Sequence, residues 1–325
     1  MGIVLDHRPK YATSGNQDID ARKPSDISFK GWRAILVRSF KQIQHDHTTI
    51  VAAGVAFNSF LSLFPLVIAT FSFYGLVVDT ATLQQHINSL TAILPPGADE
   101  LLANRLQDLT QTSEQTLGWG LALGLIVSLW AANRGTRALF EGINIAYNQQ
   151  NGRNFLWNNV LTFIVTIGAL ILGGICLLLI AVVPAIVDQL GLLPIVAGAL
   201  KFTVWPLLFA LLIVALGVIY KIAPARSSPQ IRWVSVGSLV AAVLWLIGSG
   251  LFSFFVANFS NYEETYGSVA AVVVMMLWLF LTSFVVLLGA EINSEMELQT
   301  AEDTTIGKER PMGQRNAYHA DHVAT

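Results

Sequence analysis

Residues 158–183 read NNVLTFIVTIGALILGGICLLLIAVV, a run of 26 positions without a charged side chain. A helix needs roughly 20 apolar residues to cross a hydrocarbon core about 30 Å thick. The run is therefore long enough for one transmembrane helix. The other apolar runs along the chain determine how many further transmembrane helices are predicted.

The composition of the whole chain agrees with a membrane protein. Of its 325 residues, 54% are hydrophobic and 12% are charged, whereas a soluble domain carries about a quarter charged residues. The net charge of −2 shows no basic excess, so no nucleic-acid partner is predicted. Cys176 is the one cysteine, which excludes an internal disulfide. No cleaved signal peptide is expected, and the first apolar run, from Ile50, predicts an uncleaved anchor.

Five further runs are long and apolar enough to predict spans, which gives an all-α fold with six transmembrane helices. The predicted spans are 50–78, 117–133, 158–183, 195–220, 233–259 and 268–290. The second is the shortest. The first contains Pro65, so a kink, a tilt or a break is expected there.

The distribution of Lys and Arg predicts the orientation of these spans. Seventeen basic residues fall in the two tails and in alternate loops, one (Arg105) falls in the remaining loops, and Lys201 lies within a span. Basic loops face the cytoplasm. Six spans then place both termini inside the cell, in a multi-pass membrane protein.

The segments outside the spans divide into four parts. Residues 28–49 carry apolar side chains at helical spacing with basic ones between them, which predicts an amphipathic helix on the anionic inner leaflet. The periplasmic loop 79–116 is predicted to form two short helices, separated by Pro95-Pro96-Gly97. Residues 1–27 and 298–325 are polar and aperiodic, so disordered tails are expected there.

Polar residues and prolines within the spans are the first candidates for a functional path. Asn58 and Ser62 share a face of the first helix, one turn before Pro65, and Pro206 follows Lys201 in the fourth span. Polar groups in lipid need a partner helix or a water-filled cavity. Helix packing and the lining of a substrate path are both open interpretations. Lys201 lies near the outer end, where its stem can also extend to the interface.

Charged residues at the predicted inner boundary form a second group of candidates. Arg134 and Arg137 follow the second span, and Arg137 and Glu141 are four residues apart, a spacing that permits an ion pair. These residues either anchor the topology or contact a lipid phosphate or charged substrate at an inner mouth. Glu291 ends the last span, where it either pairs with an arginine of the second loop or faces water.

Catalytic and metal-binding patterns are sparse. His45-Asp46-His47 is the one cluster that resembles a metal site, and it lacks a companion ligand, so a surface location without metal is expected. The chain has no phosphate-binding Gly-rich loop with Lys and no nucleophile elbow. No catalytic residue, cofactor or metal is therefore predicted.

Several stretches of this sequence resemble one known family. They are AAGVAFNSFLSLFPLVI (52–68), LPPGADELL (94–102), LWAANRGTRALFEGINIAYN (129–148), WVSVGSLVAAVLW (233–245) and NFSNYEETYGSVAAVVVMMLWLFLTSFVVLLGAEINSEME (258–297). With this order and spacing the chain resembles the YihY/BrkB family of bacterial inner-membrane proteins, once labelled ribonuclease BN. One departure is Phe57-Asn58, where members commonly carry an aromatic pair. The resemblance implies six helices with both ends inside, a transporter-like role, and a link to virulence and serum resistance.

Three functions are consistent with these observations. The first is a transporter, exporter or lipid-handling protein with a small-molecule or lipid substrate. The second is a membrane-associated ribonuclease, and the third is a scaffold whose tails recruit partners. Membrane lipids are the expected partners, and assembly into homo-oligomers is left open.

Overall fold

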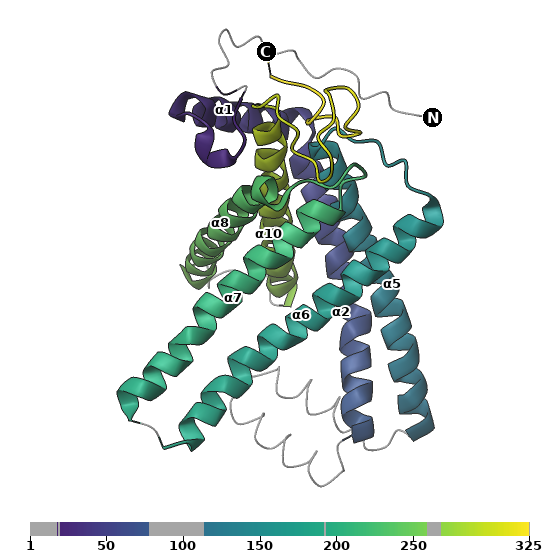
Figure 1. Ribbon diagram of the computed structural model, residues 1–325. Helices are drawn as coiled ribbons and strands as arrows, with labels where there is room; N and C mark the ends of the chain where they lie inside the picture. The colour runs from purple at the N-terminus through teal and green to yellow at the C-terminus, as the bar shows by residue number, and fades with distance from the viewer. Residues whose placement is uncertain (1–17, 19, 78–113, 192, 259–267, 325) are drawn as a thin grey trace. The chain divides into compact units, whose positions relative to one another are not determined.

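A computed structural model describes residues 18, 20–77, 114–191, 193–258 and 268–324 (Figure 1). The predicted loop helices of 79–116 lie outside the described residues, except for positions 114–116, and so does the turn 259–267. The helices in chain order are η1 (Pro24–Asp26), α1 (Phe29–His45), α2 (Thr48–Val77), α5 (Glu114–Ala146), α6 (Phe155–Gln189), α7 (Pro194–Ile222), α8 (Ile231–Asn258) and α10 (Ser268–Glu297).

The all-α prediction is confirmed for the part of the chain that the structure describes. It contains no strand there, and only an isolated bridge joins Pro229 to Thr305. Five helices are long and apolar enough to cross a membrane: Thr48–Pro65 of α2, then α6, α7, α8 and Ala270–Glu297 of α10. The predicted span 117–133 lies within α5, which is not among these five. The count of six and the cytoplasmic termini stay predictions.

The chain forms two compact units, of which the smaller comprises residues 58–135. Within it, Gly135 of α5 lies against Ser59 of α2: a Cβ on the glycine would be 3.1 Å from the serine hydroxyl. A small residue at this position lets the two helix backbones approach closely, as is common for helices in lipid.

The larger unit comprises the rest of the chain, and its core lies at one end of its helices. We call this end the packed end. It is formed by the start of α2, the ends of α5, α7 and α10, and the starts of α6 and α8. Its buried apolar residues are Ala52, Phe140, Ile143, Ala146, Tyr147, Leu216, Tyr220, Ala223, Val234, Ala241, Ala242, Val285, Leu287 and Ala290.

Two glycines allow α8 and α10 to meet closely at the packed end. A Cβ on Gly237 would overlap the carbonyl oxygen of Gly289, and a Cβ on Gly289 would overlap the hydroxyl of Tyr220. That hydroxyl donates a hydrogen bond to the carbonyl of Val286, at 2.7 Å. The close approach of three helices therefore depends on the absence of side chains at two positions.

The described residues of the two segments expected to be disordered, 18, 20–27 and 298–324, make defined contacts. Beyond α10 the chain has almost no regular structure, yet Thr300, Thr304 and His319 are fully buried. The guanidinium of Arg315 donates to four backbone carbonyls within the segment, at 2.6–3.1 Å. On the N-terminal side, Ala21 and Ile27 pack in a small cluster with Met296 of α10. Composition predicted disorder because the segments lack apolar periodicity; polar side chains bonded to backbone carbonyls hold them instead.

Candidate functional site

A buried ion pair lies at the centre of the packed end. Arg226, in the connection between α7 and α8, donates two hydrogen bonds to the carboxylate of Glu297, the last residue of α10, at 2.6 and 2.7 Å. Both side chains are 0% exposed. Such two-point contacts between guanidinium and carboxylate are strong and directional. Because burial removes both charges from water, each needs the other.

Further groups enclose the pair. The ring of Tyr147, just after α5, lies 4.5 Å from the guanidinium carbon of Arg226, a cation–π contact. The hydroxyl of Thr304 donates to the Glu297 carboxylate at 2.8 Å. The Nδ1 atom of His319 lies 2.9 Å from the Tyr147 carbonyl. The C-terminal segment thus covers the pair with a threonine and a histidine.

The electrostatics of this cluster keep its charges fixed. Burial lowers the pKa of Arg226, but the neighbouring Glu297 carboxylate raises it more, so the net pKa lies above the ordinary value. Burial, and then the Glu297 charge, raise the pKa of the Tyr147 hydroxyl. At neutral pH the arginine is therefore a cation and the tyrosine is neutral. The cluster is suited to holding helix ends together rather than to exchanging protons near pH 7.

Two side chains bind the C-terminal end of α7 beside this pair. Arg153 donates to the carbonyls of Ile222, Ala223 and Pro224 at 2.7–3.0 Å. Asn144 accepts from the backbone amide of Ala225 at 2.7 Å. The last carbonyls of a helix carry partial negative charge and have no partner within the helix. Arg153 supplies donors to these carbonyls, and the buried Asn144 side chain also donates to the Ala223 carbonyl at 3.5 Å. Burial lowers the pKa of Arg153.

The predicted residues at the inner boundary have different partners from those expected. The Arg134 guanidinium lies over the Trp130 ring at 5.1 Å, and that of Arg137 lies over the Phe155 ring at 5.9 Å. Glu141 accepts a hydrogen bond from Asn151 at 3.0 Å. The spacing of Arg137 and Glu141 permits a pair, but aromatic and amide neighbours hold the two side chains.

Glu291 is the one predicted site residue that contributes to the buried cluster. Its side chain is buried in α10, and its charge is among the causes that raise the pKa of Tyr147. Of the two expectations, facing water does not hold. Burial places this carboxylate in the same electrostatic environment as Arg226 and Glu297.

None of the predicted path residues within the spans is a member of this cluster. In the smaller unit, the Ser62 hydroxyl donates to the Ser59 carbonyl at 2.6 Å, Asn58 is half-buried, and Pro65 lies inside the continuous helix α2. In the larger unit, Lys201 of α7 donates to Asp188 of α6 at 2.6 Å. Pro206 likewise lies within an unbroken helix. The described contacts show local hydrogen bonds and one ion pair; the role of these residues in a path stays a prediction.

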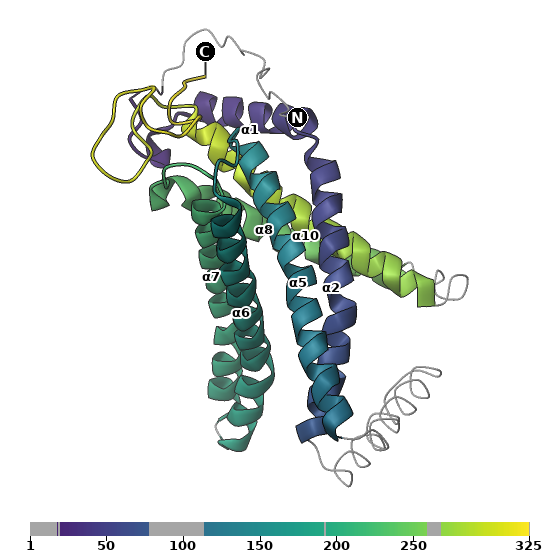
Figure 2. The ribbon, with the colours of Figure 1, turned by 90° about the vertical axis from the view of Figure 1, so that its right-hand side faces the viewer.

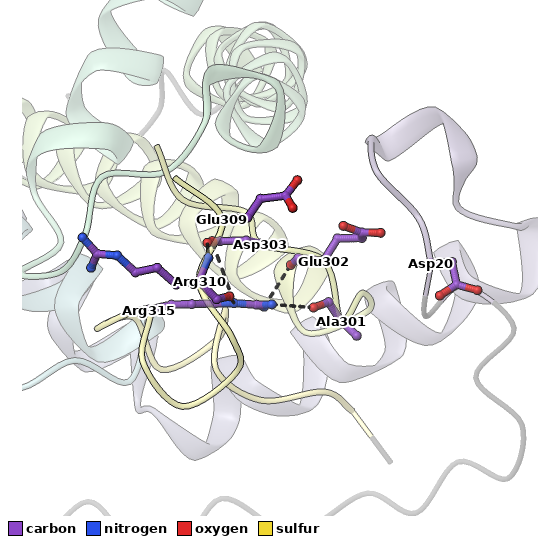
Figure 3. Close-up of a pocket in the computed structure, with 7 residues that line it drawn as sticks. All are labelled: Asp20, Ala301, Glu302, Asp303, Glu309, Arg310 and Arg315. Atoms are coloured by element: carbon purple, nitrogen blue, oxygen red, sulfur yellow. Dashed lines mark hydrogen bonds and ion pairs between the residues drawn. The ribbon is translucent and has the colours of Figure 1, made fainter. Parts of the chain in front are cut away.

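A second polar feature is a cavity of about 260 Å³ in the C-terminal segment (Figure 3). Its lining consists mainly of charged side chains: Asp20, Ala301, Glu302, Asp303, Glu309, Arg310 and Arg315. Burial raises the pKa of Asp303, but hydrogen bonds from Thr305 and from the Arg310 amide outweigh this and leave the pKa below its ordinary value. Hydrogen bonds from the same segment thus hold Asp303, one of the charged residues that line this cavity.

The histidine cluster of the sequence does not assemble a metal site among the described residues. The Nδ1 atom of His45 lies 3.0 Å from the carboxylate of Asp46, and His47 adopts a left-handed backbone conformation with φ of 50°. No group of three or more His, Cys, Asp or Glu side chains in the described ranges could hold a metal ion.

Sequence reasoning did not identify the central pair. In the sequence, Arg226 served only as one of the basic residues that predict the orientation of the spans. Glu297 is one of several acidic residues near the end of the last helix. They are separated by 71 positions, and no spacing rule joins residues so far apart. Asn144 and Tyr147 do stand at helical spacing in a polar run after the second predicted span, which was the available signal.

Comparison with known proteins adds a family and relatives. The family profile described as Virulence factor BrkB matches residues 39–313. "Putative ribonuclease-like protein YfkH" of Bacillus subtilis (strain 168) is 28% identical over 288 residues, which cover 82% of this chain and 93% of that protein. A "UPF0761 membrane protein" of Aeromonas salmonicida is 26% identical, over 78% of this chain and 85% of that protein. One of Cronobacter sakazakii is 27% identical, over 78% and 84%. No solved structure matches.

Proposed function

The chain belongs to the virulence factor BrkB family and is a multi-pass membrane protein, and from this we propose that it is a transporter, exporter or lipid-handling protein. The substrate is a small molecule or a lipid. The observation that supports the proposal is the uneven packing of the larger unit, in which one end of the helices is tightly held and the other is not.

Burial falls sharply along the helices away from the packed end. In the far halves of α6, α7 and α8 (residues 172–189, 194–208 and 245–258), the only buried apolar residues among those described are Val187 and Val204. Large apolar side chains such as Ile195 and Phe254 are exposed there. Figures 1 and 2 show α6 and α7 running side by side, and Figure 2 shows them diverging from α10.

This unevenness supports movement about the packed end. Segments with few buried contacts open at low free-energy cost, whereas a dense core with satisfied polar groups does not. The Arg226–Glu297 pair and the Arg153 contacts hold the packed end, so the far halves of α6, α7 and α8 can change their separation from one another and from α10 while this end stays closed. Such hinge motion around a fixed region is a common mechanism of transport proteins.

Reconstitution tests the proposal directly. Purified protein in liposomes is assayed with a fluorescent phospholipid, whose transfer between leaflets is read by chemical quenching, and with an entrapped fluorescent solute. Protein-containing vesicles should move at least one probe faster than empty vesicles prepared in parallel. Equal rates for both probes in the two vesicle populations would remove the support for transport of these classes.

A crosslink between helices connects the activity to the proposed motion. A Cβ on Gly248 of α8 would lie 3.4 Å from the side chain of Leu281 of α10, so cysteines at these two positions can be joined in a Cys176→Ser background. Oxidation should abolish transport and reduction should restore it, while each single cysteine variant stays active. Transport that is the same before and after complete crosslinking contradicts a motion between α8 and α10.

One relative carries a ribonuclease-like name, which keeps a membrane-associated ribonuclease as the second candidate. It requires acid–base or metal-binding groups, and His45 with His47 is the nearest such pair. Deletion of the terminal segments distinguishes a scaffold from a transporter and from a ribonuclease, because only a scaffold that recruits partners through its tails would lose its phenotype.

A further inference from the structure

The helix α1 buries polar side chains together with Ile35 against the protein and leaves large apolar side chains exposed on its other side. Phe29, Leu36 and Phe40 are 86%, 55% and 65% exposed, whereas Arg38 and Gln42 are buried. At 100° per residue, the first three lie on one side of the helix and the last two on the other. A helix of a soluble protein shows the opposite arrangement. The outward side of α1 is therefore suited to an apolar or interfacial medium.

Contacts of Arg38 fix this orientation. Its guanidinium donates to the Glu295 carboxylate at 2.9 Å, to the Glu295 carbonyl at 3.0 Å and to the Gln299 side chain at 2.8 Å. Gln299 in turn donates to Asp18 at 3.2 Å, and Asp18 accepts from the amide of Ser28, just before α1. Figure 2 shows α1 lying across the end of α10. Because these bonds are directional, α1 cannot turn its apolar side inward without breaking them.

The charge on α1 is of one sign. The helix carries four Lys or Arg residues and no Asp or Glu. Of these, Arg38 is neutralised by Glu295. Lys30 and Arg33 are exposed, and at helical spacing Arg33 falls beside Phe29, Leu36 and Phe40. Basic residues that flank exposed aromatic ones are typical of helices that bind anionic lipid surfaces.

The position of α1 in the chain places it at a membrane. Two residues separate the end of α1 from the start of α2, whose segment Thr48–Pro65 is apolar enough to span the bilayer. Two residues reach at most about 7 Å. The C-terminal end of α1 is thus held close to the end of a membrane span.

We propose that α1 is a binding surface for anionic phospholipid. Phe29, Leu36 and Phe40 insert at the boundary between headgroups and acyl chains, and Lys30 and Arg33 contact the lipid phosphates. The Arg38–Glu295 pair holds the helix in register for this contact. The occupant is the bilayer of the protein's own membrane, recognised through negative charge and apolar depth, and the inference does not depend on transport.

Depth-dependent quenching tests the proposal on the full-length protein in vesicles. A fluorescent label is attached to Phe40→Cys, or as a reference to Lys308→Cys on the exposed C-terminal segment, in a Cys176→Ser background. Vesicles contain phosphatidylcholine alone, or with one quarter phosphatidylglycerol. Label at position 40 should be quenched by a nitroxide on the lipid chain and protected from aqueous iodide, more strongly with phosphatidylglycerol. The label at position 308 should be quenched by aqueous iodide and not by the nitroxide on the lipid chain.

Charge reversal separates anionic recognition from general apolar contact. Lys30→Glu/Arg33→Glu should weaken the insertion equilibrium of α1 by about fivefold or more per charge in phosphatidylglycerol vesicles, and leave it nearly unchanged in phosphatidylcholine. Lys308→Glu/Arg310→Glu carries the same change in charge and should have no effect.

Three results would overturn the proposal. The first is iodide access at position 40 equal to that at position 308 in both vesicle types. The second is lipid quenching at position 40 that does not respond to phosphatidylglycerol or to charge reversal, which denies anionic recognition. The third is protection from iodide without lipid quenching, which identifies a protein as the occupant.

Discussion

Substitution of Arg226 by alanine should destabilise the packed end more than any surface change of the same kind. The variant leaves the Glu297 carboxylate, 0% exposed, without the guanidinium that neutralises it, although the Thr304 hydroxyl still donates to it. Removing one member of a buried ion pair costs about 3–5 kcal/mol, because the remaining charge has lost its partner. Loss of the guanidinium over the Tyr147 ring adds to this cost.

The structure provides a matched control. Arg22 and Glu302 form an ion pair at 3.4 Å whose side chains are 79% and 33% exposed. A surface pair of this kind contributes about 0–1 kcal/mol. Arg22→Ala removes the same guanidinium from the same protein, so the difference between the two variants isolates the effect of burial.

Thermal unfolding in detergent is the measurement. A loss of 3–5 kcal/mol corresponds to a fall in melting temperature on the order of 10 °C for a chain of this size, whereas Arg22→Ala should shift it by about 2 °C or less. Replacement of both residues of the buried pair, Arg226→Met with Glu297→Leu, should recover much of the loss because no buried charge is left. If Arg226→Ala melts like Arg22→Ala, the pair does not hold the packed end and the reasoning fails.

Three further predictions follow from single positions. Gly289→Ala should lower the free energy of unfolding by about 1–3 kcal/mol, because its Cβ overlaps neighbouring helices. Gly250→Ala, where a Cβ meets no other atom, should be neutral or slightly stabilising. The melting temperatures of the two variants test this difference. Asp303 has a pKa below its ordinary value. Its contribution to stability is therefore present above about pH 4 and is lost as the pH falls through the native pKa. The difference in melting temperature between wild type and Asp303→Asn should shrink toward zero as the pH is lowered from about 4 through the native pKa. Alanine at both His45 and His47 should leave any ribonuclease activity of the purified protein unchanged, since that activity would come from a contaminant; a loss that tracks the double substitution supports the nuclease candidate.

Family membership gives these experiments a common context. Two of the relatives are named as membrane proteins, and the region matched by the family profile, residues 39–313, includes the helices that form the packed end. Variants of the buried pair test whether the fold depends on it, while the crosslink between α8 and α10 tests whether the far halves move. Results from the two sets can be interpreted separately because the first measures stability and the second measures transport.

Hydropathy along the chain was enough to predict most of the long apolar helices. The predicted spans 158–183, 195–220 and 233–259 lie within α6, α7 and α8 with ends that differ by a few residues, apart from position 259, which is not described. This accuracy has a physical reason: the bilayer thickness sets the length and apolarity of each span, whatever its neighbours are. The amphipathic helix before the first span was predictable for a similar reason, because its periodicity is local.

Which polar groups contact one another became visible only in the folded protein. Arg226 and Glu297, or Arg38 and Glu295, are brought together by helix packing over long separations in sequence, and composition does not encode such pairs. The C-terminal segment was expected to be disordered because it lacks apolar periodicity, yet Arg315 and its carbonyl partners order it. Local sequence patterns predict the helices whose length and apolarity the bilayer sets. The partners of buried charges depend instead on the three-dimensional arrangement of the whole unit.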